Sequence, residues 1–184
     1  KGWTNHSLTV GTNNIMYVTT TSSGNTTNRQ GRVFISGKLD GRITVVNEED
    51  VYIKAHLEYA NFPTNASCND ALGLVSKDDI WVDTSAPNNL RIHAAMMATG
   101  VITADSGSFG VVNHNTGSPR GDLNVWGSIV QELRGAVGTF NSSGTATGFS
   151  KKYGYDQRFR SNPPPYYPRL GTKLELSDWR EGPG

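Results

Sequence analysis

The chain has 184 residues and a formal net charge of +1, and only 18% of its residues are charged. The low net charge and the presence of four Trp, seven Tyr and six Phe exclude an intrinsically disordered protein. Val and Ile together outnumber Leu two to one, and the chain contains 21 Gly. Both features disfavour a helical bundle. No apolar run approaches the ~20 residues of a membrane helix, and the single cysteine, Cys68, cannot form an intramolecular disulfide.

Short strands with alternating apolar residues recur along the chain. The expected strands include residues 33–35, 43–45, 51–53, 72–74, 80–82, 109–111 and 123–125. In each, the first and third side chains are apolar and would point to the same face. Two further segments, 91–99 and 128–134, could each form a short helix, the second with a capping-box pattern. Because each is short for a stable helix and is followed by Gly, both are also interpreted as strands. Such regularly spaced short strands predict a sandwich, a barrel or a solenoid.

An internal repeat favours the solenoid. Residues 45–54 (VVNEEDVYIK) and 74–83 (LVSKDDIWVD) align at an offset of 29 residues. Their apolar positions coincide, and so do Asp50 with Asp79 and Tyr52 with Trp81. Repeated strand–turn–strand units bury their apolar faces by stacking on one another. We therefore predict an all-β chain that forms a right-handed parallel β-solenoid (β-helix).

The C-terminal part of the chain is more basic than the rest. Residues 1–133 have a net charge of −3, whereas residues 134–184 have a net charge of +4. Three consecutive prolines, residues 163–165, cannot donate the backbone hydrogen bonds of a central strand. We expect this Pro-rich segment to run extended and to pack on the outside of the solenoid. The expected divisions are an N-terminal strand/loop segment (1–30), the β-solenoid (31–150) and a basic, aromatic and Pro-rich C-terminal segment (151–184).

No catalytic motif is present in the sequence. The four histidines have no metal-ligand spacing, and there is no GxSxG motif or P-loop. The acidic turns 48–50 and 78–79 could bind a divalent cation if they stacked, but such turns are usually only solvated. A carbohydrate-active β-helix enzyme would need convergent carboxylates in a cleft, and nothing in the sequence identifies them. We predict a non-enzymatic protein without a cofactor or metal site.

Basic and aromatic residues alternate in the C-terminal segment, which is typical of a nucleic-acid surface. Basic side chains neutralise phosphates, and aromatic rings stack on unpaired bases. The candidates are Arg134, Lys151, Lys152, Arg158 and Arg160 for phosphate contacts, and Tyr153 and Tyr155 for stacking. Alternatively, this segment pairs with the acidic turns of its own solenoid. The isoelectric point near 8.0 is below that of a dedicated nucleic-acid binder.

Several strings of the sequence together resemble one family. They are GRVFISGKLDGRITVVNEEDVYI (31–53), LGLVSKDDIWV (72–82), IHAAMMA (92–98), GSIVQELRGAVGTF (127–140), KKYGYDQRFRSNPPPYYP (151–168) and SDWRE (177–181). With these strings the chain resembles the β-solenoid domain of large type IV pilus-associated minor pilins, the group of the competence pilin ComZ. The last strings, a Tyr-Asp-x-Arg segment followed by the prolines, are the most specific.

The resemblance implies a location and partners. It implies an extracellular, pilus-associated protein at the cell surface, joined to other pilin subunits through an upstream hydrophobic helix that this sequence lacks. It also implies DNA as a partner, captured during natural transformation. The alternative within the same family is a structural or adhesive pilus module that does not bind DNA.

Overall fold

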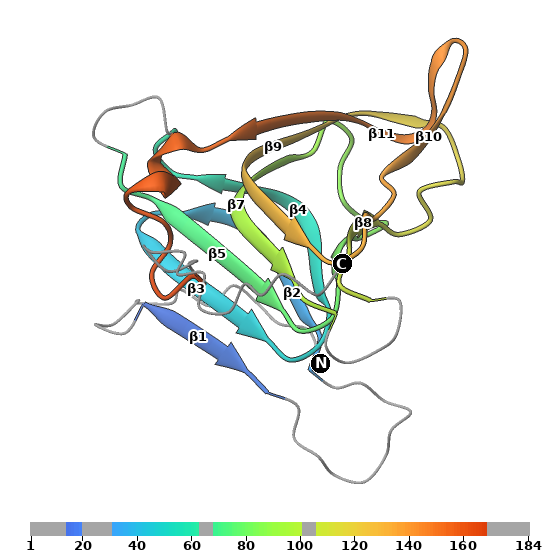
Figure 1. The fold of residues 1–184 in the computed structure, drawn as a ribbon. Helices are drawn as coiled ribbons and strands as arrows, with labels where there is room; N and C mark the ends of the chain where they lie inside the picture. The colour runs from blue at the N-terminus through green and yellow to red at the C-terminus, as the bar shows by residue number, and fades with distance from the viewer. Residues whose placement is uncertain (1–13, 20–30, 63–67, 101–105, 169–184) are drawn as a thin grey trace, which may run out of the picture.

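The computed structural model describes residues 14–19, 31–62, 68–100 and 106–168. Its eleven strands wind into a parallel β-solenoid of about four turns (Figure 1), as the sequence predicts. The described part contains no α-helix, and its one helical segment is a short 3₁₀-helix. No helix among the described residues is long and apolar enough to cross a membrane. Residues 1–13 and 20–30 of the expected N-terminal segment, and residues 169–184 of the C-terminal one, lie outside the described residues.

The expected strands are present, and most are longer than the sequence indicated, except that 123–125 and 128–134 belong to one strand that ends at Gln131, so residues 132–134 are not part of it. The strands are β1 (Ile15–Val18), β2 (Val33–Leu39), β3 (Arg42–Asn47), β4 (Val51–Tyr59), β5 (Ala71–Ser76), β6 (Ile80–Val82), β7 (Arg91–Ala98), β8 (Phe109–Val111), β9 (Pro119–Gln131), β10 (Gly138–Asn141) and β11 (Gly144–Tyr155). Strands β1, β10 and β11 were not predicted from the sequence. Strand β11 runs across the boundary expected at 150/151, and its Gly, Lys and Thr residues hide the apolar alternation.

The strands stack in three ladders, one on each side of the coil. The first ladder contains β1, β3, β5 and the C-terminal halves of β7 and β9. The second contains the N-terminal halves of β2 and β4, followed by β6 and β8. The third contains the C-terminal halves of β2 and β4, the N-terminal halves of β7 and β9, and β11. Strand β10 forms an antiparallel hairpin with the start of β11, which projects from the body in Figure 1.

The repeat offset of 29 residues is the register of the coil. Tyr52 pairs with Trp81, as the aligned repeats predict. The same offset also joins Ile80 to Phe109 in the next turn. Stacked inward positions therefore fill the central column with aliphatic and aromatic side chains. Val51 and Ile80, for example, are completely buried, and each such side chain contributes about 1.5–3 kcal/mol of burial free energy.

The segment after β11 packs on the outer face of the first ladder, as expected from its prolines. A single turn of 3₁₀-helix, η1 (Gln157–Arg160), leads into the prolines. Arg42 donates from Nη2 to the carbonyl oxygen of Pro163 over 2.6 Å. The ring of Tyr167 lies against Gly73, where an added Cβ would be 2.9 Å from it. This packing forms a second hydrophobic cluster, made of Ala71, Val75, Ala95, Phe159 and Tyr167.

Candidate functional site

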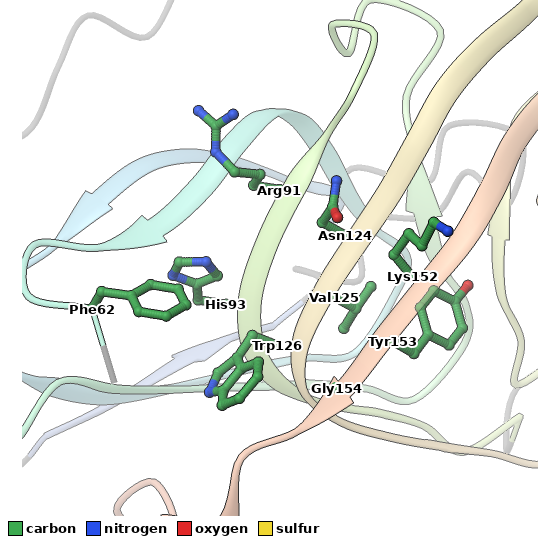
Figure 2. Close-up of a pocket in the computed structure, with 9 residues that line it drawn as sticks. All are labelled: Phe62, Arg91, His93, Asn124, Val125, Trp126, Lys152, Tyr153 and Gly154. Atoms are coloured by element: carbon green, nitrogen blue, oxygen red, sulfur yellow. The ribbon is translucent and has the colours of Figure 1, made fainter. Parts of the chain in front are cut away.

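A groove of about 520 Å³ opens on the outer face of the third ladder (Figure 2). Two rows of residues cross neighbouring strands there. The first row is Arg91, Asn124 and Lys152, and the second is His93, Trp126 and Gly154. They face outward because the residues between them on β7 and β9, Ile92 and Val125, are buried in the column. The groove therefore has a polar row and a row of rings side by side.

The rings form one continuous wall. Phe62, from the loop after β4, has its ring centroid 5.2 Å from that of His93 and 5.8 Å from that of Trp126. Figure 2 shows the three rings grouped on one side of the groove. The Trp126 ring lies directly against β11, because a Cβ on Gly154 would be 2.8 Å from it. Phe62 remains 47% exposed, so its ring is open to a ligand.

The polar row carries positive charge. Arg91 binds Glu58 from Nε to Oε1 over 2.6 Å, and this hydrogen bond lowers the pKa of the Glu58 carboxyl. Burial lowers the pKa of His93, and its Nδ1 accepts the backbone N–H of Tyr59 over 3.1 Å, so this imidazole is neutral near pH 7. Because Glu58 balances Arg91, the net charge of the groove comes from Lys152. No Asp or Glu is among the described residues that line the groove.

The predicted phosphate and base contacts occupy separate places. Lys152 and Tyr153 both line the groove, whereas Lys151 and Tyr155 are not among its lining residues (Figure 2). Lys151 and Tyr155 alternate with Lys152 along β11, so their side chains point to the other side of the strand. The amine of Lys151 lies 6.0 Å from the ring centroid of Tyr153. Burial and the nearby Arg134 lower the pKa of Lys151, while burial raises the pKa of Tyr153 to about 12.

The two remaining candidates, Arg158 and Arg160, lie in η1. Arg158 forms an ion pair with Asp156 over 2.6 Å. It also donates to the carbonyl oxygens of Cys68 and Asp70 over 3.0 and 3.1 Å. The guanidinium therefore fastens the C-terminal segment to the loop before β5. Arg160 is exposed at the end of η1.

Seven lining residues of the groove were not predicted as site residues. They are Phe62, Arg91, His93, Asn124, Val125, Trp126 and Gly154. The alternation of polar or aromatic residues around Ile92 and Val125 was a usable signal for outward-facing pairs. However, the registers that bring these pairs together are 33 residues between β7 and β9 and 28 between β9 and β11. Neither register equals the repeat offset, so the rows could not be assembled from the repeat.

A second cluster lies in the turns between the first and second ladders. The carboxylates of Asp50, Asp78 and Asp79 lie within 4.8 Å of one another, so the acidic turns do stack. The backbone N–H of Asp79 donates to Asp50 over 3.3 Å, and that of Ser108 donates to Asp79 over 2.7 Å. Asp50 and Asp78 are only 5% and 1% exposed. Burial, together with the negative charge of Asp78, raises the pKa of both Asp50 and Asp79.

These raised pKa values predict a loss of stability at higher pH. The unfolded chain releases the two protons near the ordinary value of 3.8, before the folded chain does. Their contribution is therefore fully present below about pH 4 and falls as the pH rises through the raised values. An Asp79→Asn variant, which still accepts the Ser108 N–H, should melt about 2–4 °C higher than the parent at pH 8. Near pH 3 the two should melt together.

Thermal unfolding followed by circular dichroism at several pH values measures this effect. The control is Asp40→Asn, which removes one exposed carboxylate outside the cluster. An equal rise in melting temperature at pH 8 in both variants would show that the change in net charge, rather than the repulsion within the cluster, causes the stabilisation.

Comparison with known proteins assigns no family. No protein-family model, no curated protein and no solved structure matches this chain. The function is therefore inferred from the groove, the charges around β11 and the resemblance of the sequence.

Proposed function

We propose that this chain is a non-enzymatic module of a type IV pilus-type machine, exposed on the outside of the cell, that captures DNA. The observation that carries this proposal is the arrangement of cations around β11. Lys152 projects into the groove, whereas Lys151 projects to the other side of the same strand beside Arg134. A phosphate backbone crossing this strand would meet positive charge on both sides.

The open edge of β11 also favours a nucleic-acid backbone. Among the described strands, residues 151–155 pair only with β9, so the opposite edge of β11 is free of a strand partner. Backbone N–H groups are among the protein groups that contact phosphates. Arg91 lies two strands from Lys152, which corresponds to about 10 Å across the ladder. Phosphates along one strand could therefore contact several of these groups at once.

The location and the other partners come from the resemblance to minor pilins. A parallel β-solenoid is the architecture that this resemblance implies, which supports it. Other pilin subunits would then be reached through a helix outside this sequence. The non-enzymatic role remains a prediction from the sequence. The three clustered aspartates lie in turns between the other two ladders, and two of them are buried.

Reversing the two lysine charges should weaken DNA binding. We expect Lys151→Glu/Lys152→Glu to bind a labelled duplex about tenfold or more weakly at 50 mM salt. The slope of affinity against salt concentration should fall by about two, because each lost phosphate contact removes about one unit. Fluorescence anisotropy at several salt concentrations measures both quantities.

The matched control reverses two exposed lysines on earlier turns, Lys38→Glu/Lys54→Glu. This control has the same net charge as the test variant and should retain affinity much closer to the parent. If the parent does not bind duplex even at low salt, or if both variants lose the same affinity, DNA capture at β11 is wrong. The structural or adhesive role would then be the remaining function.

A further inference from the structure

We infer that the groove on the third ladder holds one unpaired base of a single-stranded nucleic acid, stacked on Phe62 and Trp126. This inference rests on the proposed function and adds to it the form of the ligand. It also adds base stacking on rings that the sequence did not single out. Of the two predicted stacking residues, Tyr153 lines the groove and Tyr155 does not.

The size and lining of the groove suit one nucleoside. A volume of about 520 Å³ falls within the range of sites that enclose small ligands. The ring wall gives a base a flat apolar surface, and base–aromatic stacking contributes about 1–3 kcal/mol per base. Phe62 is the most accessible ring, at 47% exposure.

The polar row supplies the remaining contacts of a nucleotide. Asn124 lies between the two cations in the row, and its amide offers both a donor and an acceptor to the edge of a base. Lys152, on the neighbouring strand, would neutralise the adjacent phosphate. The lining has no carboxylate among the described residues to repel it. The edge of the base would thus contact Asn124, its face would contact the rings of Phe62 and Trp126, and the phosphate would contact Lys152.

A duplex cannot use the rings in this way. Its bases are stacked inside the helix, and turning one outward costs a few kcal/mol. A duplex would therefore contact only the charged residues around β11. Single strands, frayed ends and gaps present unpaired bases without that cost, and we expect the groove to select them.

Three probes of equal length separate ring contacts from phosphate contacts. They are a thymidine oligonucleotide, an abasic oligonucleotide with the same phosphate backbone, and a duplex. Anisotropy titrations at low salt should show the parent binding the thymidine probe about tenfold more tightly than the abasic probe. Phe62→Ala should remove that difference and leave binding of the abasic and duplex probes unchanged.

Two further variants make the test specific. Trp126→Phe keeps an aromatic ring and removes an indole N–H that is buried without a hydrogen-bond partner, so the fold should tolerate it. In the parent, the thymidine probe should quench the fluorescence of Trp126. In the Trp126→Phe variant this part of the quenching should be absent. Phe34→Ala removes a 56% exposed ring on the second ladder and should have no effect on any probe.

The outcomes distinguish the two proposals. Equal binding of thymidine and abasic probes, or an equal loss on all three probes in Phe62→Ala, would overturn base stacking in the groove while leaving DNA capture intact. If the duplex does not bind the parent even at low salt, DNA capture at β11 is wrong, whatever the single-stranded probes do.

Discussion

Replacing Gly127 with alanine is expected to destabilise the solenoid by about 3 kcal/mol or more. Gly127 lies where β9 passes from the third ladder to the first, beside Ala94 of β7. A Cβ there would be 1.8 Å from the carbonyl oxygen of Ala94 and 2.6 Å from its carbonyl carbon. Both atoms belong to the backbone, so no side chain can move aside. The two strands would have to separate at a buried corner.

Urea denaturation followed by circular dichroism measures this loss. The control is Gly37→Ala, because Gly37 has a φ of +113° but no atom within 4 Å of an added Cβ. That variant has backbone strain without a collision, and we expect it to cost about 1–2 kcal/mol. If Gly127→Ala were no more destabilised than Gly37→Ala, the close approach of β7 and β9 would be incorrect.

Removing Arg158 should have the second largest effect. Its ion-pair partner, Asp156, is 1% exposed, and Arg158 itself has 25% of its side chain exposed. Arg158→Ala would leave a buried carboxylate without its partner, and such changes cost about 3–5 kcal/mol. It would also remove the two hydrogen bonds that fasten the C-terminal segment to the loop before β5. We expect a loss of about 3 kcal/mol in the free energy of unfolding.

Two comparisons identify the cause of this loss. Arg160→Ala removes an exposed cation two residues away and should change stability by less than about 0.5 kcal/mol. The double variant Asp156→Asn/Arg158→Ala should recover part of the loss, because it neutralises the stranded carboxylate, and the Asn side chain can still accept the backbone N–H of residue 158. Failure of the double variant to recover any stability would mean that the ion pair is not what the alanine removes. DNA binding by Arg158→Ala must be measured where the variant is folded.

The solenoid could be predicted because the register between its stacked strands equals the offset of one internal sequence repeat. The strands around Val45 and Leu74 and around Tyr52 and Trp81 repeat at the offset by which they pair. The position of the Pro-rich segment could also be predicted, because prolines cannot form a central strand. These features depend on local residue chemistry, which a single sequence reveals.

The groove could not be predicted, because it depends on how far apart the turns are along the chain. Arg91 and Asn124 meet only because the connection between β7 and β9 has a particular length. The candidate residues on β11 were chosen by charge and residue type, and neither reveals whether a residue faces the groove. Arg158 shows the same limit, since a partner as buried as Asp156 cannot be recognised from sequence.

The register offsets have a consequence for how this scaffold can change. Successive strands of the first ladder are 29 residues apart between β3 and β5 but 22 apart between β5 and β7, yet both pairs are in parallel register. The column thus tolerates connections of different length at its corners. Phe62 belongs to one such connection, the loop between β4 and β5. Selection can therefore exchange the residues that meet a ligand by altering a corner loop, while the stacked interior and its folding remain as they are.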